Sequence, residues 1–158
     1  MEVSMAMKKQ IIFCIGEGTY GIDVSKVMGI EKDIPVVSIP NAPACVKGII
    51  NLRGDVIPVF SLREKFHMPT DVKLDTKELV IAKSRGVVIA IEVDLVKEIA
   101  ELDDSKIGPA PTIIKGEGTE YIDSVAQVDD GLVIILDLDG LLDNEQADHL
   151  QTIVENQQ

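Results

Sequence analysis

Short runs of aliphatic and β-branched residues recur along most of the chain, separated by turn residues such as Gly54, Gly86 and Gly131. Apolar and polar positions that alternate with a period of two are typical of strands that bury one face. The pattern predicts four pairs of strands and therefore a mainly β protein. The expected pairs are residues 10–15 with 20–24, 46–52 with 56–62, 79–82 with 87–93, and 122–128 with 132–138.

Helical signals in this sequence are short. Val27 and Ile30 lie three positions apart, which predicts a single helical turn over residues 25–30. Residues 63–66 have the character of a second helical turn, and residues 95–99 fit either a short helix or a continued strand. We therefore expect helices to play a minor part in the fold.

One proline and the C-terminal tail interrupt the strand pattern. Pro58 lies inside a predicted strand, and because it has no N–H to donate we expect it at a sheet edge or a bulge. The tail from Asp143 has Leu150, Ile153 and Val154 on one side, which predicts a frayed helix.

The apolar pattern repeats within the chain. Residues 22–30 match residues 91–99 at an offset of 69 positions, and residues 49–66 match residues 125–142 at an offset of 76. A repeat of this kind indicates two similar structural units, although chance similarity among Val- and Ile-rich strands is the alternative. A sheet of four or five short strands leaves its edges open, and closure into a barrel removes them.

The predicted fold is mainly β, with two SH3-like five-stranded β-barrel subdomains packed around a shared hydrophobic core, together with short helices. We expect each half of the chain to close into one barrel. The two barrels form a single domain over residues 8–143, and residues 1–7 and 144–158 are expected to be flexible or helical tails.

Composition narrows the range of partners. Among 158 residues the formal net charge is −12, only 3% are aromatic, and there is no tryptophan. An acidic surface without an aromatic platform disfavours binding to nucleic acids and to anionic membranes. No apolar run approaches the roughly 18 residues needed to span a bilayer, so we expect a cytoplasmic protein without membrane insertion. A protein partner is the natural expectation.

Candidate catalytic groups are few. His67 and His149 lie in polar segments without metal-ligand spacing, Cys14 lies in a strand, and Cys45 lies in the proline-rich loop, where we expect it to be partly exposed. We expect no metal, no cofactor and no enzymatic activity. A small cysteine-dependent enzyme that uses Cys45 remains the alternative from another functional class.

Residues 48–63 closely resemble the signature of CheW-like chemotaxis coupling proteins. The most specific part is Asn51-Leu52-Arg53-Gly54 followed by a strand with a central proline. The resemblance extends over residues 8–143, and further matching segments are residues 20–24, 40–43, 93–94, 109–111 and 134–139.

The resemblance implies a fold of two five-stranded barrels and an adaptor function. Such proteins bind the regulatory domain of the histidine kinase CheA and the cytoplasmic hairpin tip of methyl-accepting chemoreceptors, which recruits them to membrane receptor arrays. We expect this chain to do the same and to be monomeric when isolated. A CheW-like scaffold of a non-motility chemosensory pathway is the alternative within the family.

Candidate binding residues follow from the resemblance together with the apolar pattern. A receptor hairpin is expected to dock in the seam between the barrels, with Arg53 as the main polar contact; an internal ion pair of Arg53 with Asp55 or Glu31 is the alternative. The predicted receptor-binding residues are Arg53, Val27, Gly29, Ile30, Gly48, Leu79 and Ile99, and the predicted kinase-binding residues are Ile39, Ala44, Pro109, Pro111 and Ile113.

Two positions depart from the family pattern. Gly29 stands where the family usually has a glutamate, and Ser61 stands where an aspartate is usual, although Asp137 keeps the acid at the repeated position. The choice of receptor is therefore expected to differ from that of typical members.

Overall fold

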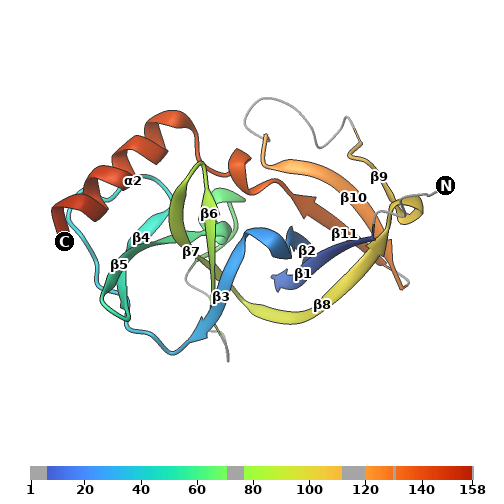
Figure 1. The fold of residues 1–158 in the computed structure, drawn as a ribbon, viewed down its shortest axis with the longest axis horizontal. Helices are drawn as coiled ribbons and strands as arrows, with labels where there is room; N and C mark the ends of the chain where they lie inside the picture. The colour runs from blue at the N-terminus through green and yellow to red at the C-terminus, as the bar shows by residue number, and fades with distance from the viewer. Residues whose placement is uncertain (1–6, 71–76, 112–119, 130, 158) are drawn as a thin grey trace.

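The structure is a computed structural model, and it describes residues 7–70, 77–111, 120–129 and 131–157. These residues form a predominantly β architecture, as the alternating pattern predicts (Figure 1). The strands are β1 (Met7–Ile15), β2 (Gly18–Asp23), β3 (Val27–Lys32), β4 (Val46–Leu52), β5 (Asp55–Ser61), β6 (Glu78–Ser84), β7 (Val87–Val93), β8 (Leu95–Asp103), β9 (Ile107–Pro109), β10 (Ile122–Val128) and β11 (Gly131–Leu136). The helices are α1 (Leu62–Lys65) and α2 (Asn144–Gln157), with short 3-10 turns η1 (Val24–Lys26), η2 (Asp104–Lys106) and η3 (Leu138–Gly140).

The strands form two separate sheets that lie side by side in Figure 1. Barrel one is the sheet β8-β1-β2-β11-β10-β9, and barrel two is the sheet β3-β6-β7-β5-β4. In barrel one, β8 continues through η2 directly into β9, so one length of chain lies at both edges. In barrel two, Val37 follows β3 and exchanges two backbone hydrogen bonds with Ile49 of β4, at 2.8 and 2.9 Å. Each sheet is thereby closed by the chain that continues from one of its edge strands, which is β8 in barrel one and β3 in barrel two.

The strand pairings of the two barrels are related by the sequence repeat. The parallel pairing of β5 with β7 places Val59 opposite Ala90, and that of β11 with β2 places Ile135 opposite Gly21. These pairs are related by the offsets of 76 and 69 positions found in the sequence, which confirms the repeat. The predicted two SH3-like barrel subdomains are therefore present.

The expectation that each half of the chain forms its own barrel is wrong. Barrel one combines β1 and β2 with β8 to β11, whereas barrel two combines β3, β4 and β5 with β6 and β7. The chain crosses into barrel two after β2 and returns after β7. Because of this exchange, β2 and β7 each pair with a strand from the other half of the chain. The two halves must therefore fold together.

A shared hydrophobic core lies between the barrels, as predicted. Its largest buried side chains include Phe13 and Ile22 of barrel one and Phe60 and Ile91 of barrel two. Each barrel also has a smaller interior of its own. The interior of barrel two contains Ile50, Ile57, Val59, Leu79, Ile81 and Ala90, and that of barrel one contains Ile12, Leu102, Ala126, Val133 and Ile135.

The predicted helical turn over residues 25–30 is wrong, because most of this segment is strand β3. Only η1 is helical, and Asp23 caps it by accepting a hydrogen bond from the N–H of Ser25. Half-buried and exposed positions then alternate along β3, which pairs with β6. The three-residue spacing of Val27 and Ile30 was a weak signal that strand pairing overrides. Residues 95–99 likewise continue as a strand within β8.

Pro58 lies in an inner strand, contrary to the expectation of a sheet edge, but the β4–β5 pairing has a register shift between Val46 and Gly48, next to the position opposite Pro58. β5 has β4 on one side and β7 on the other. Opposite Pro58 stands Ile49, whose N–H and C=O are both directed to Val37. The pairing of β5 with β7 starts at Val59, one residue later. The missing N–H of Pro58 therefore interrupts neither ladder, which removes the physical reason for an edge position.

The C-terminal tail contains the 14-residue helix α2, which packs against barrel two. Its start carries a reciprocal cap: Asp143 accepts a hydrogen bond from the N–H of Gln146, and Gln146 accepts one from the N–H of Asp143. Ala147 and Leu150 are buried in the shared core, and Ile153 packs against it. The domain boundary at residue 143 stays a prediction, but the helix is anchored to the barrels.

Candidate protein-binding surfaces

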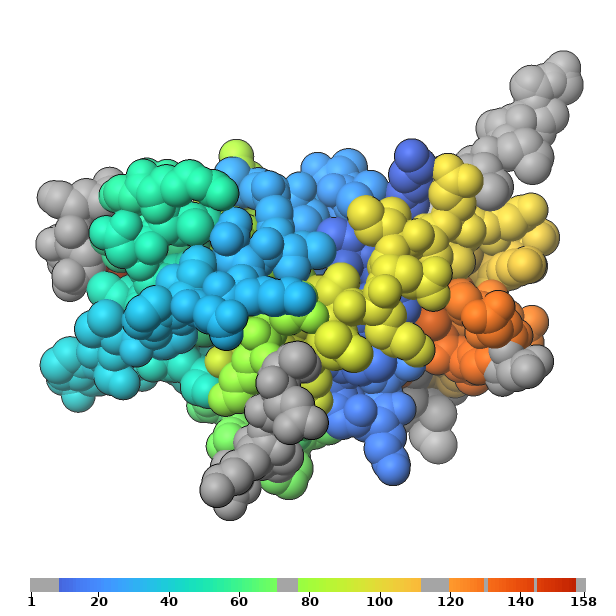
Figure 2. Space-filling view, turned by 90° about the horizontal axis from the view of Figure 1, so that it is seen from below, coloured from blue at the N-terminus to red at the C-terminus, as the bar shows by residue number. Residues whose placement is uncertain are grey.

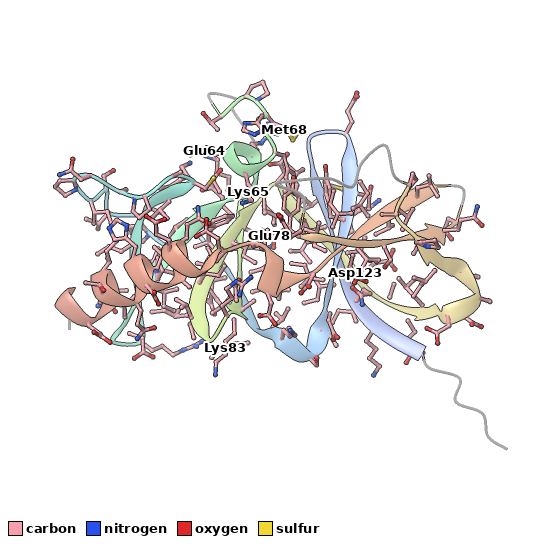
Figure 3. All side chains as sticks on the ribbon, turned by 90° about the horizontal axis from the view of Figure 1, so that it is seen from above. Glu64, Lys65, Met68, Glu78, Lys83 and Asp123 are labelled. Atoms are coloured by element: carbon pink, nitrogen blue, oxygen red, sulfur yellow. The ribbon has the colours of Figure 1, made fainter. Side chains whose placement is uncertain are left out.

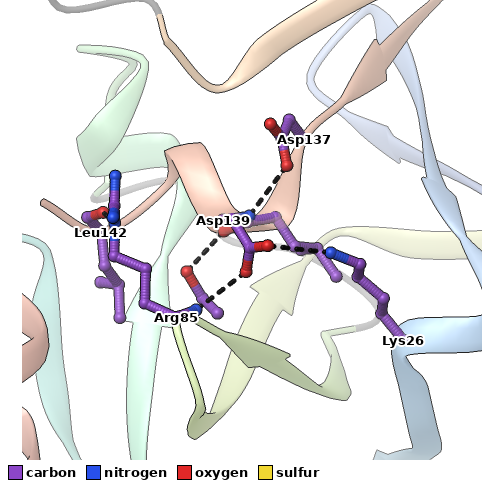
Figure 4. Close-up of polar contacts among 7 residues, drawn as sticks. Lys26, Arg85, Asp137, Asp139 and Leu142 are labelled. Atoms are coloured by element: carbon purple, nitrogen blue, oxygen red, sulfur yellow. Dashed lines mark hydrogen bonds and ion pairs between the residues drawn. The ribbon is translucent and has the colours of Figure 1, made fainter.

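Two hydrogen-bonded clasps hold the barrels together at their junction. In the first, Arg63 donates two hydrogen bonds to Asp94, at 2.6 and 3.0 Å, and the N–H of Gly16 donates to the same carboxylate. In the second, Asp139 accepts hydrogen bonds from Lys26 at 3.0 Å and from the N–H of Arg85 at 2.9 Å (Figure 4). The two barrels are therefore fixed relative to each other by polar contacts as well as by the core.

The first clasp is much less exposed than the second. The side chains of Arg63 and Asp94 are 11% and 14% exposed, against 41% and 52% for Lys26 and Asp139. Burial opposes the charge of Asp94, but the hydrogen bonds from Arg63 and Gly16 outweigh it and lower the pKa of Asp94. The hydrogen bond from the backbone of Arg85, followed by that from Lys26, lowers the pKa of Asp139.

A buried carboxylate and a row of aromatic rings also cross the junction. Glu78 of β6, near the middle of Figure 3, accepts a hydrogen bond of 2.9 Å from the N–H of Val96 in β8. Four aromatic rings follow one another, with neighbouring centroids 5.9, 5.0 and 5.4 Å apart. In order they are Phe13, Tyr20, Phe66 and Tyr121. Although aromatic residues are few in this chain, most of them stiffen this junction.

A groove of about 430 Å³ opens at the free end of barrel two, and we call it the Arg53 groove. Arg53 and Gly54 form the tight turn between β4 and β5, with φ of +53° and +92°. Both positive φ values are required by a two-residue hairpin turn of this type. The groove is lined by Met28, Gly29, Glu31, Leu52, Arg53, Asp55, Val56, Ile57, Ile81, Gly86, Val87, Val88, Gln151 and Val154.

Arg53 projects from this turn into solvent, with a side chain that is 79% exposed. Its recorded partner within the described part of the chain is Glu31, at a distance of 3.6 Å. The internal ion pair considered as the alternative is therefore present, yet the contact is too long for a strong hydrogen bond. Within the same barrel, Arg85 has the same place in the β6–β7 turn that Arg53 has in the β4–β5 turn. Its Nε, however, donates a hydrogen bond to the carbonyl of Leu142. Arg53 thus keeps donors available for a partner, whereas Arg85 has a structural role.

The structure accounts for both departures from the family pattern. Gly29 and Glu31 lie on the same face of β3, and a Cβ at Gly29 would lie 3.8 Å from Oε2 of Glu31. The groove therefore has acidic groups, those of Glu31 and Asp55, without a glutamate at position 29. Ser61 caps α1 by accepting a hydrogen bond from the N–H of Glu64, as Asp137 caps η3. A serine serves this purpose as well as an aspartate.

A second groove, of about 220 Å³, opens at the free end of barrel one, and we call it the Asp129 groove. All nine of its lining residues are related by the offsets of 69 and 76 to residues that line the Arg53 groove. The matching positions of the two turns are Asp129 and Arg53, and both have a φ of +53°. The lining residues are Ile12, Thr19, Lys97, Glu98, Val128, Asp129, Gly131, Leu132 and Val133.

A third surface, which we call the β3–β8 face, carries exposed apolar side chains of two strands. Met28 and Ile30 extend from β3, and Leu95 and Ile99 extend from β8. Figure 2 shows β3 in blue and β8 in yellow as neighbours across one side of the molecule. The predicted residues Ile30 and Ile99 therefore share this face, at the seam between the barrels.

Other predicted receptor-binding residues lie inside the protein. Leu79 is 5% exposed and belongs to the interior of barrel two, and Val27 is half-buried against the shared core. Gly48 is buried, and a Cβ at this position would overlap the carbonyl oxygen of Val37. Gly48 therefore permits the close approach that seals barrel two. These three positions support the surface from within, whereas Arg53, Gly29, Ile30 and Ile99 form it.

The predicted kinase-binding residues lie in two loops on different barrels. Ala44 is exposed and Ile39 is half-buried in the segment between β3 and β4. Pro109 ends β9, and Pro109 and Pro111 are both exposed at barrel one. Ile113 lies outside the described residues.

The chemistry around Cys45 does not favour a nucleophile. The expectation that Cys45 is partly exposed is wrong, because this residue is buried, and its N–H donates a hydrogen bond to Glu64 of α1. Figure 3 shows Glu64 and Lys65 on this short helix. Burial, and then the charge of Glu64, raise the pKa of Cys45, so its thiol stays protonated. Among the described residues no group of three or more His, Cys, Asp or Glu side chains is arranged to hold a metal ion.

Comparison with known proteins assigns the architecture to a family of adaptors. The model of the CheW-like domain matches residues 9–146, and the chain belongs to this family. The chain is 35% identical to the chemotaxis protein CheW of Klebsiella aerogenes over 137 residues, which cover 86% of this chain and 82% of the relative. It is 30% identical to the chemotaxis protein CheW of Treponema pallidum over 158 residues, with 97% and 92% covered.

A solved structure supports the same assignment. The scaffolding protein TtCheW from Thermoanaerobacter tengcongensis superposes with a TM-score of 0.81 at 32% sequence identity. The match covers 89% of this chain and 97% of that protein. These similarities favour a chemotaxis adaptor over both alternatives, the cysteine-dependent enzyme and the non-motility scaffold.

Proposed function

We propose that this protein is a chemotaxis adaptor that couples methyl-accepting chemoreceptors to a CheA-type histidine kinase through protein–protein binding. The observation that carries the proposal is the β3–β8 face, where apolar side chains of both barrels are exposed together in a protein of the CheW-like family. Exposed apolar residues grouped in this way mark interaction surfaces. The described residues also contain no helix that could cross a membrane.

The receptor tip is proposed to dock on the β3–β8 face. A helical hairpin presents apolar side chains at helical spacing, and these can pack on Ile30 and Ile99. Met28 belongs to this face and also lines the Arg53 groove, so one ligand can extend from the face to Arg53. This binding recruits the adaptor from the cytoplasm to the receptor array.

The kinase is proposed to bind away from this face, through the loops around Ala44 and Pro111. Both residues are exposed and lie on different barrels, so a regulatory domain of similar two-barrel fold can contact either end of the molecule. Replacing Ala44 or Pro111 by a larger charged residue is expected to reduce kinase capture and to leave receptor binding unchanged. Unchanged kinase capture by both folded variants would remove these loops from the proposal.

The receptor surface is tested by the change of Ile99→Asp in β8. Binding of a purified receptor signalling fragment is expected to weaken at least tenfold, since a charge would enter an apolar contact. Leu132→Asp is the matched control, because Leu132 is equally exposed but lies in the Asp129 groove. Equal affinities of the two variants and the unmodified protein would contradict docking at the β3–β8 face.

A further inference from the structure

The Arg53 groove is larger than its counterpart, and residues of α2 form part of the difference. Nine positions are common to the two grooves, yet the volumes are about 430 and 220 Å³. Gln151 and Val154 of α2 line the Arg53 groove, and no α2 residue lines the described part of the Asp129 groove. Besides α2, Glu31, Gly86 and Val87 line the Arg53 groove without a counterpart in the lining of the Asp129 groove.

The wall contributed by α2 is fixed in place by the core. Leu150 is 1% exposed and Ala147 is 8% exposed, so the helix cannot move away without exposing apolar area. Gln151 is exposed and Val154 is half-buried on the groove side of the same helix. Both residues lie beyond residue 142, where the internal repeat ends. The wall is therefore an addition to the repeated framework.

The groove combines apolar walls with one cation and two carboxylates, those of Glu31 and Asp55. Val154, Val56 and Met28 supply apolar surface, and Arg53 is the one basic residue among the described lining residues. Its guanidinium is exposed and its contact with Glu31 is 3.6 Å long. A carboxylate that approached Arg53 would form charge-assisted hydrogen bonds, which Glu31 does not supply at this distance. The complementary ligand therefore carries a carboxylate next to apolar side chains.

We propose that α2 is a specificity element, and that Gln151 and Val154 contact a helical segment of the receptor that presents a carboxylate to Arg53 and apolar side chains to the wall. This inference rests on the proposed function and deepens it, because it assigns the receptor contact to a helix outside the repeated framework.

The test uses the full chain and the change of Val154→Asp, which puts a negative charge on the α2 wall of the groove that Arg53 also lines. Affinity for a receptor signalling fragment, measured by titration calorimetry, is expected to fall about tenfold or more. Thr152→Asp is the matched control: it adds the same charge on the same helix at an exposed position that does not line the groove. Its affinity is expected to stay within about twofold of the unmodified protein.

A second variant, Gln151→Ala, keeps the test decisive if the charged variant unfolds, because Gln151 is exposed and its replacement leaves the core intact. A loss of affinity for the receptor fragment, non-additive with that of Arg53→Ala, would support the inference. Folded wall variants that bind the fragment as tightly as Thr152→Asp would overturn it and leave the adaptor function standing. Failure of the unmodified chain to bind the receptor fragment would instead overturn the proposed function, and with it this inference.

Discussion

The two barrels share one framework, but their free ends differ. The strand order and the parallel pairings are equivalent, and nine positions recur between the two grooves. At the tip of the equivalent turns, barrel two has Arg53 and barrel one has Asp129, with the same backbone φ. Barrel two additionally has α2 as a wall. The framework follows from what the halves have in common, whereas the proposed binding function depends on the positions where the repeat is broken.

The two clasps show the same contrast within the junction. Arg63 and Asp139 occupy positions related by the offset of 76 residues, and the backbone donors Gly16 and Arg85 are related by the offset of 69. The charges are reversed between the clasps. One clasp is nearly buried and doubly hydrogen-bonded, and the other is exposed. We therefore expect the two sides of the junction to differ in strength.

The largest expected effect comes from breaking the buried clasp. Arg63→Ala removes the two hydrogen bonds that Arg63 donates to the carboxylate of Asp94 at a site that is 14% exposed, and we expect the free energy of unfolding to fall by about 3 kcal/mol. Chemical denaturation measures this loss. A decrease below about 1 kcal/mol would show that the two clasps contribute equally to stability, which would contradict the expected difference between them.

The next largest effect concerns the ends of the barrels. Arg53→Glu is expected to reduce affinity for the receptor fragment about thirtyfold, or roughly 2 kcal/mol, because a favourable charge becomes a repulsive one. The folded state should be preserved, since Arg53 is 79% exposed. The matched change, Asp129→Arg in the equivalent turn, is expected to leave receptor affinity nearly unchanged. Equal losses in both variants, measured by the same titration, would mean that the grooves are not functionally distinct.

Acid should weaken the buried clasp, and the change of Asp94→Asn tests this effect. The pKa of Asp94 is lowered in the folded state, so the unfolded chain binds more protons there. The stability from this group is fully present above the unfolded pKa of about 4 and is lost as pH falls through the lower folded pKa. Asp94→Asn should therefore unfold with a shallower dependence on pH below about 4, as followed by circular dichroism. An unaltered pH profile would remove Asp94 from the acid response.

The smallest effect is expected at the exposed clasp. Lys26→Ala removes an ion pair whose partners are 41% and 52% exposed, and stability should fall by less than about 1 kcal/mol. The loss should also diminish at high salt, because exposed charges are screened. Thermal unfolding at two salt concentrations checks both statements. A loss as large as that of Arg63→Ala would contradict the asymmetry of the junction.

Most of the strand framework could be predicted from the sequence because strand periodicity and the repeat are local signals. The strands 46–52, 87–93 and 122–128 agree with β4, β7 and β10 to the residue. The exchange of strands between the halves could not be predicted, since parallel pairing between distant segments has no local signature. β3 was mistaken for a helix because two apolar residues three positions apart satisfy either pattern over so short a stretch.

The candidate site was only partly predictable. Arg53 stood out because a tight turn normally selects asparagine, aspartate or glycine. Leu79 could not be assigned to the interior from its sequence, because an exposed and a buried leucine carry the same local signal. The ion pair of Arg53 with Glu31 was one of the alternatives considered from the sequence, whereas the role of Val154 depends on distant neighbours that no motif marks. The offsets of 69 and 76 were the one signal that could have located the second groove in advance.

The most direct test of the central claim is whether one molecule of this protein joins a receptor to a kinase. The purified chain is mixed with a receptor signalling fragment and a CheA regulatory domain, and the masses of the complexes are determined by light scattering. The account predicts a ternary complex that is lost in Ile99→Asp, which should still bind the kinase domain. Binding of the two partners that is mutually exclusive, or binding of neither, would contradict it.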